Sequence, residues 1–219
     1  MKVFGFEAKR AFEYENGFYL TSDVRRMGKL LAHYDLYKRI VGLPGAIVEC
    51  GVFKGASLVR FATFRELLES PFSRESVGFD AFGAFPREGD EGDREFIEAF
   101  EDEAGTGIAP EELQEVLAYK GIRNVTLVPG DINAAVPDVA ASRPELRIAL
   151  LHVDVDVYVP TRTILEHLYP RLVPGGLLVL DDYGKVAGET RAVDEYFAER
   201  GARLEKLPIS HIPAFIVAS

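Results

Sequence analysis

The sequence predicts an α/β fold in which helices cover both faces of a mostly parallel sheet. Short apolar segments, each the length of a buried strand, alternate along the chain with longer segments of helical periodicity. Such alternation is typical of βαβ units, whose strands run parallel. The last two apolar segments are too close together for a helix to lie between them, so we expect the sheet to end in an antiparallel pair.

The first predicted elements are a helix and a strand on either side of Gly42. Ser22 has the character of an N-cap, and apolar side chains then recur at helical spacing until glycine and proline end the helix. Ala46–Cys50 is predicted to be a short apolar strand, and the helix Ala56–Leu68 follows it after a turn. The apolar stripe on the first helix comprises Met27, Leu30, Leu31, Tyr34, Tyr37 and Ile40.

The alternation continues to the end of the chain. Pro160 suits the first turn of a helix, and Gly201 suits the end of another. Further strands are predicted at Ser76–Phe79, Asn124–Val128, Arg147–Val153, Gly176–Leu180, Arg203–Pro208 and Pro213–Ala218. Further helices are predicted at Asp93–Glu103, Pro110–Lys120, Pro160–Leu172 and Gly188–Arg200.

The N-terminal segment differs from the rest of the chain. Residues 1–20 contain many aromatic side chains without a clean period, which fits a pocket cap, an oligomer contact or packing on the core. We therefore divide the chain into an aromatic and helical cap, residues 1–42, and a main domain, residues 43–219. The aromatic segment also leads us to expect a homodimer.

Charge and cysteine content exclude several classes of protein. With 25 Lys and Arg against 35 Asp and Glu, the net charge is −10, which argues against binding nucleic acid or an anionic membrane through bulk charge. The single cysteine, Cys50, excludes an intramolecular disulfide framework and suits a reducing compartment. No apolar run approaches the roughly 18 residues of a membrane span, and the N-terminus has no signal-peptide pattern. We expect a cytoplasmic protein.

Much of the negative charge lies in one segment, residues 86–103. It holds nine acidic and two basic residues, which gives −7 of the net −10. We interpret the segment as a solvated loop and helix face. The alternative is a mobile lid over a cationic ligand or a metal, with glycines at Gly83, Gly89 and Gly92 to provide flexibility.

A loop with two glycines follows the first predicted strand. Residues Glu49 to Gly55 do not form a G-x-G-x-x-G motif but fit the E-x-G-x-x-x-G loop that holds the amino-acid part of S-adenosylmethionine. Asp80 ends the second strand, where a carboxylate can accept hydrogen bonds from both hydroxyls of a ribose. Asp131 follows the third strand and suits either an adenine amino group or the N-cap of a helix.

Four acidic residues follow two apolar strands: Asp154 and Asp156 the fourth, and Asp181 and Asp182 the fifth. If these strands are neighbours, the like charges crowd together unless a proton or a cation lies between them. Oxygen ligands of this kind suit magnesium, calcium or manganese. Strand alternation would point Asp154 and Asp156 to the same side if the strand persists. The structural alternative is two capped strand ends at a solvated edge.

Taken in order, these segments resemble the macrocin-type (TylF-like) sugar O-methyltransferases, a metal-dependent family of class I S-adenosylmethionine-dependent methyltransferases. The resemblance runs from about Ser22 to the C-terminus. It implies a Rossmann-like, seven-stranded sheet and methyl transfer to a sugar hydroxyl of a glycosylated natural product, a nucleotide sugar or a polysaccharide. The segments that carry it are Ile47–Val52, Gly78–Phe82, His152–Tyr158, Leu168–Pro170, Pro174–Gly176 and Asp181–Gly184.

The resemblance also implies roles for individual residues. The residues implied to hold S-adenosylmethionine are Glu49, Gly51, Gly55, Ser57, Asp80 and Asp131. The residues implied to hold Mg²⁺ (or Mn²⁺) are Asp154, Asp181 and Asp182. Asp156 is the candidate general base, a role that Asp154 can share. The chain departs from the family at Gly55-Ala56-Ser57, where members often carry two glycines.

Three other activities share part of this pattern. A catechol or phenol O-methyltransferase uses a similar magnesium site, usually with Asp-Asn in place of Asp181-Asp182. A phosphatase of the haloacid-dehalogenase type would begin with the strand before Asp154, and a metal-dependent glycosyltransferase would not explain the loop from Glu49. His152, which would point with Asp154, is interpreted as a buried histidine with satisfied hydrogen bonds.

Overall fold

The computed structural model describes residues 1–3, 5–85 and 93–219, apart from the side chains of Arg94 and Glu95. Within these residues, seven strands form one sheet in the order β5-β4-β3-β6-β7-β9-β8. The strands are β3 (Ala46–Cys50), β4 (Ser76–Asp80), β5 (Val125–Pro129), β6 (Ile148–Val153), β7 (Leu172–Leu180), β8 (Glu205–Lys206) and β9 (Ala214–Val217). The first five are parallel, and β9 pairs antiparallel with β7 and β8. The predicted fold class is confirmed.

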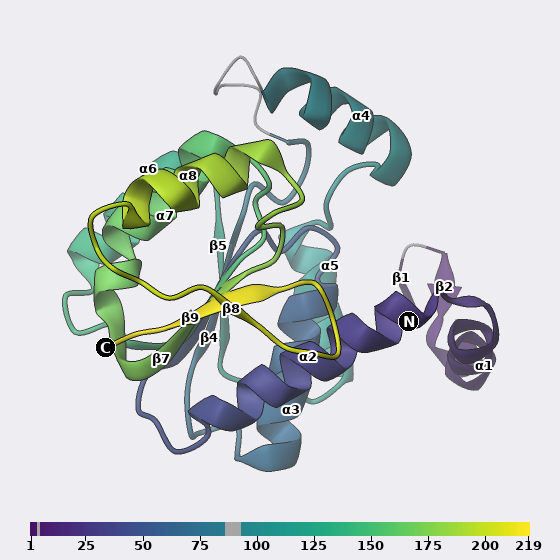
Figure 1. Ribbon diagram of the computed structural model, residues 1–219. Helices are drawn as coiled ribbons and strands as arrows, with labels where there is room; N and C mark the ends of the chain where they lie inside the picture. Colours follow the sequence, from purple (N-terminus) through teal and green to yellow (C-terminus); the bar gives the residue numbers. More distant parts are fainter. Residues whose placement is uncertain (4, 86–92) are drawn as a thin grey trace.

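Helices cover both faces of the sheet (Figure 1). The helices are α1 (Ala11–Thr21), α2 (Val24–Ile40), α3 (Ala56–Leu68), α4 (Arg94–Ala104), α5 (Pro110–Tyr119), α6 (Ile132–Ser142), α7 (Tyr158–His167) and α8 (Ala187–Phe197). α6, α7 and α8 pack together over one face, while α2, α3 and α5 lie over the other. Two core layers therefore enclose the strands.

The order of the strands places a ligand crevice at a defined edge. The chain begins the parallel sheet at β3, adds β4 and β5 on one side, and then adds β6 and β7 on the other. In such sheets the crevice opens beyond the carboxyl ends of the strands, where the order reverses. β3 and β6 meet at this point, and every residue of both strands is buried.

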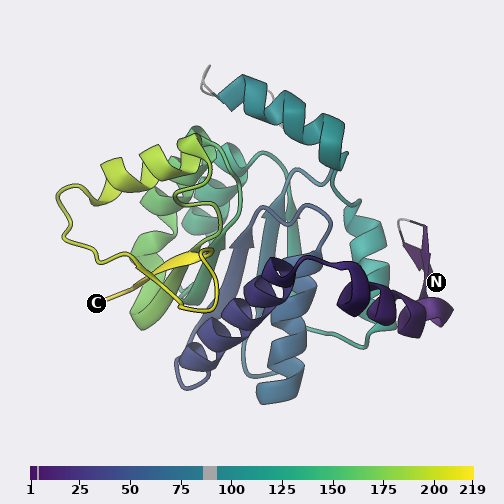
Figure 2. The same ribbon diagram turned by 45° about the vertical axis from the view of Figure 1, so that its right-hand side comes forward.

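The N-terminal segment projects from the body of the protein (Figure 2). It contains two short strands, β1 (Lys2–Val3) and β2 (Phe6–Glu7), and helix α1, none of whose residues is buried. By contrast, α2 belongs to the main core, because Leu36 and Ile40 pack with residues of the sheet. The division of the chain at residue 42 stays a prediction. No helix among the described residues has the length and apolar character needed to cross a membrane.

Several predicted element boundaries were wrong. Ser22 ends α1, whereas the N-cap of α2 is Asp23, whose carboxylate accepts a hydrogen bond from Arg25 N at 2.8 Å. The buried face of α2 includes His33 and excludes Leu31, which is 44% exposed. The helix predicted from Pro160 begins two residues earlier and gives way to a 3-10 turn, Tyr169–Arg171, before β7. Helices α1 and α6 are not among the predicted elements.

Candidate active site

A cavity of about 560 Å³ opens beyond the carboxyl ends of the parallel strands. Its walls come from the segments that follow β3, β4, β5, β6 and β7, together with side chains of α2 and α4. Figure 2 shows α4 above this edge of the sheet. The described part of the acidic segment therefore forms a wall of the cavity through Ile97, Phe100 and Glu101. Residues 86–92, the other part of the proposed lid, lie outside the described residues.

The loop after β3 touches the loop after β6. Gly51 has a φ of +93°, and a Cβ atom on it would lie 1.7 Å from the carbonyl oxygen of Asp154. Asp154 N in turn donates a hydrogen bond of 2.9 Å to Cys50 O. Glycine is required here because the backbone conformation is left-handed and the second backbone leaves no room for a side chain. This contact brings the predicted cofactor loop against the first of the predicted metal ligands.

Asp80 holds the same loop from the other side. One of its oxygens accepts hydrogen bonds from Val52 N at 2.8 Å and Phe53 N at 2.9 Å, and the other accepts from Phe82 N at 2.6 Å. The carboxylate is half-buried and lines the cavity. Its position is thus fixed by three backbone donors, while an acceptor position faces the space that a ligand would fill.

The remaining predicted cofactor residues fall into two groups. Asp131 lines the cavity and is also the N-cap of α6, since its Oδ1 accepts from Asn133 N at 2.8 Å. Glu49, Gly55 and Ser57 are not among the residues that line the cavity. Glu49 is fully buried, accepts a hydrogen bond from the Ser57 hydroxyl, and has Oε1 3.8 Å from His152 Nδ1. The structure therefore brings Gly51, Asp80 and Asp131 together at the cavity. Glu49 instead lies in the buried interior, beside Ser57 and His152.

The four predicted acidic residues meet in the cavity wall. Ligand atoms of Asp154, Asp181 and Asp182 lie within 4.8 Å of one another, and Asp156 lines the same cavity. The strand does not persist to Asp154 and Asp156, as their predicted common orientation would require, because β6 ends at Val153 and Asp156 has a φ of +64°. A turn, rather than strand alternation, brings Asp156 to the site.

The electrostatics of this carboxylate cluster, Asp154, Asp156, Asp181 and Asp182, disfavour full ionisation. Burial and the neighbouring Asp182 raise the pKa of Asp156 to about 8. Burial and the charge of Asp181 raise the pKa of Asp154 well above its ordinary value, and they raise the pKa of Asp182 as well. Oδ1 of Asp181 is buried without a hydrogen-bond partner within normal distance. Despite its burial, the pKa of Asp181 is by contrast lowered well below its ordinary value by the neighbouring histidines and Lys29. Four crowded carboxylates, three of them with raised pKa values, fit a hard divalent cation such as Mg²⁺ or Mn²⁺.

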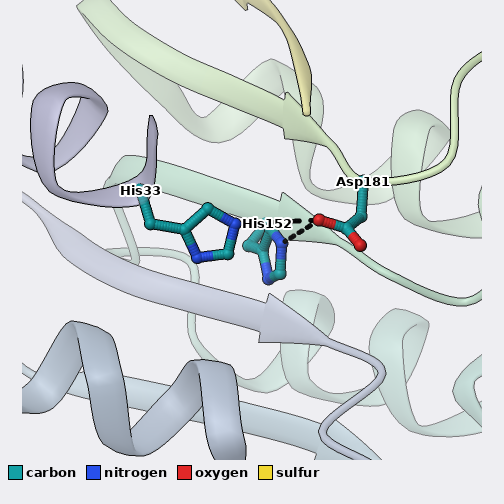
Figure 3. A group of neighbouring side chains, drawn as sticks. All are labelled: His33, His152 and Asp181. Atoms are coloured by element: carbon teal, nitrogen blue, oxygen red, sulfur yellow. Dashed lines mark ion pairs between the residues drawn. The ribbon is translucent and has the colours of Figure 1, made fainter. Parts of the chain in front are cut away.

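Two histidines, His33 and His152, lie beside Asp181 (Figure 3). Only His152 was among the residues that the sequence indicated. His152 is fully buried, as predicted, and its Nε2 lies 3.5 Å from Asp181 Oδ1. Its hydrogen bonds are not satisfied in the ordinary sense, because both ring nitrogens lack a partner within hydrogen-bond distance. Burial alone would lower its pKa, but the facing carboxylates of Asp181 and Glu49 raise the pKa to about 10. His33 of α2 packs beside it, with ring centroids 5.2 Å apart.

The metal-free protein is expected to lose stability as the pH rises from about 6.5 to about 8. The pKa of Asp156 is raised from 3.8 to about 8, and that of His152 from 6.5 to about 10. Over this range the folded protein binds more protons than the unfolded chain, so raising the pH favours unfolding. The pKa of His33 is lowered to about 3, so His33 opposes this trend only below pH 6.5. The unfolding temperature in EDTA, measured across the range, tests the expectation.

Two variants test whether the carboxylate cluster causes this dependence of stability on pH. Asp156→Asn should flatten the dependence on pH, whereas Asp138→Asn, at an exposed position on α6, should leave it unchanged. Adding Mg²⁺ should also flatten it, because a cation favours the ionised carboxylates. An unfolding temperature that stays level or rises between these pH values in EDTA would contradict the expectation.

Comparison with known proteins agrees with this geometry. The sequence model of the family described as macrocin O-methyltransferase (TylF) matches residues 23–217. The chain belongs to this family. Its match starts at Asp23, the N-cap of α2, and includes all four acidic residues of the cluster and the loop after β3. The predicted family resemblance is thereby confirmed.

Two curated relatives are named as O-methyltransferases. Mycinamicin III 3''-O-methyltransferase of Micromonospora griseorubida is 30% identical over 168 residues, which is 73% of this chain and 63% of the relative. The 8-demethyl-8-(2,3-dimethoxy-alpha-L-rhamnosyl)-tetracenomycin-C 4'-O-methyltransferase of Streptomyces olivaceus is 30% identical over 147 residues, 65% of this chain and 54% of that protein. The matched region is thus less than two thirds of the length of either relative.

Solved structures show the same fold. The apo structure of CalS11, described as a TDP-rhamnose 3'-O-methyltransferase, has a TM-score of 0.75 at 30% identity and covers 96% of this chain and 88% of that one. The O-methyltransferase NovP has a TM-score of 0.76 at 23% identity and covers 88% of this chain and 80% of its own. The arrangement described above is that of class I methyltransferases.

Proposed function

We propose that this protein transfers a methyl group from S-adenosylmethionine to a sugar hydroxyl in a reaction that depends on Mg²⁺ or Mn²⁺. The proposal rests on the observation that Gly51, Asp80 and the carboxylate cluster all line the same cavity. The Gly51 loop also lies directly against Asp154. Its volume of about 560 Å³ lies within the range of small-molecule sites. A cofactor and a metal held by these two sets of residues would be neighbours.

The cofactor would lie along the strand ends. Gly51 allows close approach of the backbone, and Asp80 is held by three backbone N–H groups in an orientation suited to ribose hydroxyls. Asp131 uses Oδ1 to cap α6, and its carboxylate also faces the cavity, where it suits an amino donor. Glu49 and Ser57 would support the position of the Gly51 loop through their hydrogen bond to each other. They would not contact the cofactor, since neither lines the cavity.

Asp154, Asp181 and Asp182 would hold the cation. The cation, when bound, supplies Lewis acidity that lowers the pKa of the acceptor hydroxyl. Asp156 then accepts the hydroxyl proton, a role that Asp154 shares. The pKa of about 8 at Asp156 means that this carboxyl group holds a proton near neutral pH in the metal-free protein. Positive charge among its neighbours lowers that pKa and gives the ionised form that a general base requires.

The acceptor would lie against the wall that α4 contributes. Phe53 and Phe100 line the cavity with ring centroids 5.2 Å apart, and Phe85 lies beside Phe100 at 6.3 Å. These rings add apolar surface to a cavity that the carboxylates also line. Such a site suits a deoxysugar, which has both hydroxyl groups and apolar faces. We therefore infer a sugar of a glycosylated natural product, a nucleotide sugar or a polysaccharide as the acceptor.

Calorimetric titration with S-adenosylmethionine, with Mg²⁺ and with EDTA, tests the cofactor assignment. Asp80→Asn is expected to weaken binding by a factor of about ten to a hundred, since one charged acceptor for ribose hydroxyls is lost. Asp138→Asn, an exposed substitution on α6, should bind as wild type does. Absence of binding by the wild-type protein in both conditions would refute the proposal.

The homodimer stays a prediction. The described part of the N-terminal segment exposes large apolar side chains, with Phe12 77% and Leu20 83% exposed. Such side chains on a projecting helix suit contact with a second copy of the chain. Absence of nucleic-acid binding and a cytoplasmic location likewise remain expectations from composition.

A further inference from the structure

A lysine of α2 contacts the carboxylate cluster directly. Lys29 Nζ forms an ion pair and hydrogen bond with Asp181 Oδ2. The Lys29 side chain is 26% exposed and that of Asp181 is 3% exposed. His33 lies one turn further along α2, and its Nε2 is 3.7 Å from the other oxygen, Oδ1. Residues four apart lie on one face of a helix, so α2 directs both side chains toward Asp181 and binds its Oδ2 through Lys29.

The ring of His33 has a defined tautomer. Arg60 Nη1 lies 3.1 Å from His33 Nδ1, and a guanidinium group can only donate. Nδ1 is therefore the acceptor, and Nε2 carries the proton and faces Asp181 Oδ1. The proton on His33 Nε2 faces Asp181 Oδ1 from 3.7 Å, beyond hydrogen-bond distance, and leaves this nitrogen no lone pair for a metal. Although His33, His152 and Asp181 have the spacing of a metal site, their protonation makes them a support for Asp181 instead.

The ammonium group of Lys29 lies in the field of the remaining carboxylates as well. Burial would lower its pKa, but Asp181, Asp154 and Asp182 raise it, so the group stays positively charged. These three residues are the ones that fit a divalent cation. The positive charge of Lys29 thus stands at the residues where the metal would be held, and it is attached to the protein by a flexible side chain.

We propose that Lys29 is a tethered counter-ion that takes the place of the metal at Asp181 and must be displaced when a divalent cation binds. The inference rests on the metal site of the proposed function. It means that the metal affinity is set by competition with Lys29 and is lower than the carboxylates alone would give. His152 remains an ion-pair partner of Asp181 Oδ1 at 3.5 Å, so displacement of Lys29 frees Oδ2 without removing every positive charge from Asp181.

Titration with Mn²⁺, followed by the loss of the free-ion signal in electron paramagnetic resonance, measures this competition. Lys29→Met keeps the length of the side chain and removes its charge, and it is expected to bind Mn²⁺ at least about tenfold more tightly than wild type. Lys29→Arg, which keeps the charge, should bind no more tightly than wild type. Lys185→Met removes a charge from an exposed position after β7 and should have wild-type affinity. Lys29→Gln serves if Lys29→Met does not fold.

Thermal unfolding distinguishes this role from a structural one. Lys29→Met should unfold at a lower temperature than wild type in EDTA, because the cluster has lost its counter-ion, and should gain more stability from Mn²⁺. Equal or weaker Mn²⁺ affinity in Lys29→Met, with wild type still binding the ion, would overturn the role of Lys29 alone. If neither protein binds Mn²⁺, both this inference and the metal site fail, while binding of S-adenosylmethionine is decided by its own titration.

Discussion

Methyl transfer is expected to fall by roughly a thousandfold when Asp182 is replaced by alanine, since a Lewis-acidic cation supplies several kcal/mol to the transition state. Asp182 lines the cavity and belongs to the group of three carboxylates that fit a metal. Asp182→Asn retains a neutral oxygen ligand and should therefore lose less activity than Asp182→Ala. Initial rates with S-adenosylmethionine and a sugar acceptor, at saturating Mg²⁺, give the comparison.

The stability of Asp182→Ala shows whether the variant loses activity through unfolding. The raised pKa of Asp182 shows that its charge is disfavoured in the folded protein, through burial and the charge of Asp181. Removing the carboxylate should thus leave the metal-free protein at least as stable as wild type. Asp138→Asn, on the exposed side of α6, is the matched control for activity. Activity of Asp182→Ala close to that of wild type would refute a metal-dependent reaction at this cluster.

Gly51→Ala is expected to destabilise the protein by about 4 kcal/mol or more, because strain and overpacking each cost up to about 3 kcal/mol. The added Cβ atom would lie 1.7 Å from Asp154 O, and the φ of +93° is unfavourable for any side chain. The backbone of one loop must move, and with it either the cofactor loop or Asp154. Denaturation by urea, monitored by circular dichroism in EDTA, measures the loss.

Gly121 provides the matched control for this substitution. Its φ of +69° is also positive, but a Cβ atom there would have no neighbour within 4 Å. Gly121→Ala should therefore cost only about 1–2 kcal/mol, the strain of the left-handed backbone alone. Equal destabilisation by the two substitutions would show that the contact between the loops is not tight.

The sequence predicted the sheet well because its strands carry two independent signals. β3 and β6 are short strands that are apolar apart from Glu49 and His152, and a glycine loop follows the first and acidic residues the second. Buried strands of a parallel sheet have this composition on both faces, so the pattern indicates their topology as well as their position. The meeting of Asp154 with Asp181 followed from the neighbouring strands to which they are attached.

Helices without a regular apolar stripe were harder to predict. α1 buries no residue, so its aromatic side chains follow no helical period. α6 contains Pro137, which argues against a helix, although Asp131 as N-cap and buried Ile132, Val136 and Ala140 at four-residue spacing mark it. The four-residue spacing of these three apolar residues is the feature of the sequence that indicates a helix here.

The charged residues beneath the site depend on tertiary contacts. Lys29 and Asp181 are 152 positions apart, and no local pattern joins them. The predicted stripe on α2 shares only Tyr37 and Ile40 with the buried face and does not include Lys29 or His33. Similarly, the turn at Asp156 depends on packing after β6 rather than on strand period. Sequence reasoning therefore found the acidic ligands but missed the bases that support them.

The pair formed by Glu49 and His152 has a consequence for how the chain folds. The two residues face each other in the register of β3 and β6, the central strands of the sheet. A shift of one residue would place Glu49 opposite Leu151 or Val153 and leave two buried polar groups without opposite charge. Alignments other than the native one therefore carry an electrostatic penalty at the centre of the sheet. These two residues make the pairing of the strands unique as well as supporting the site above it.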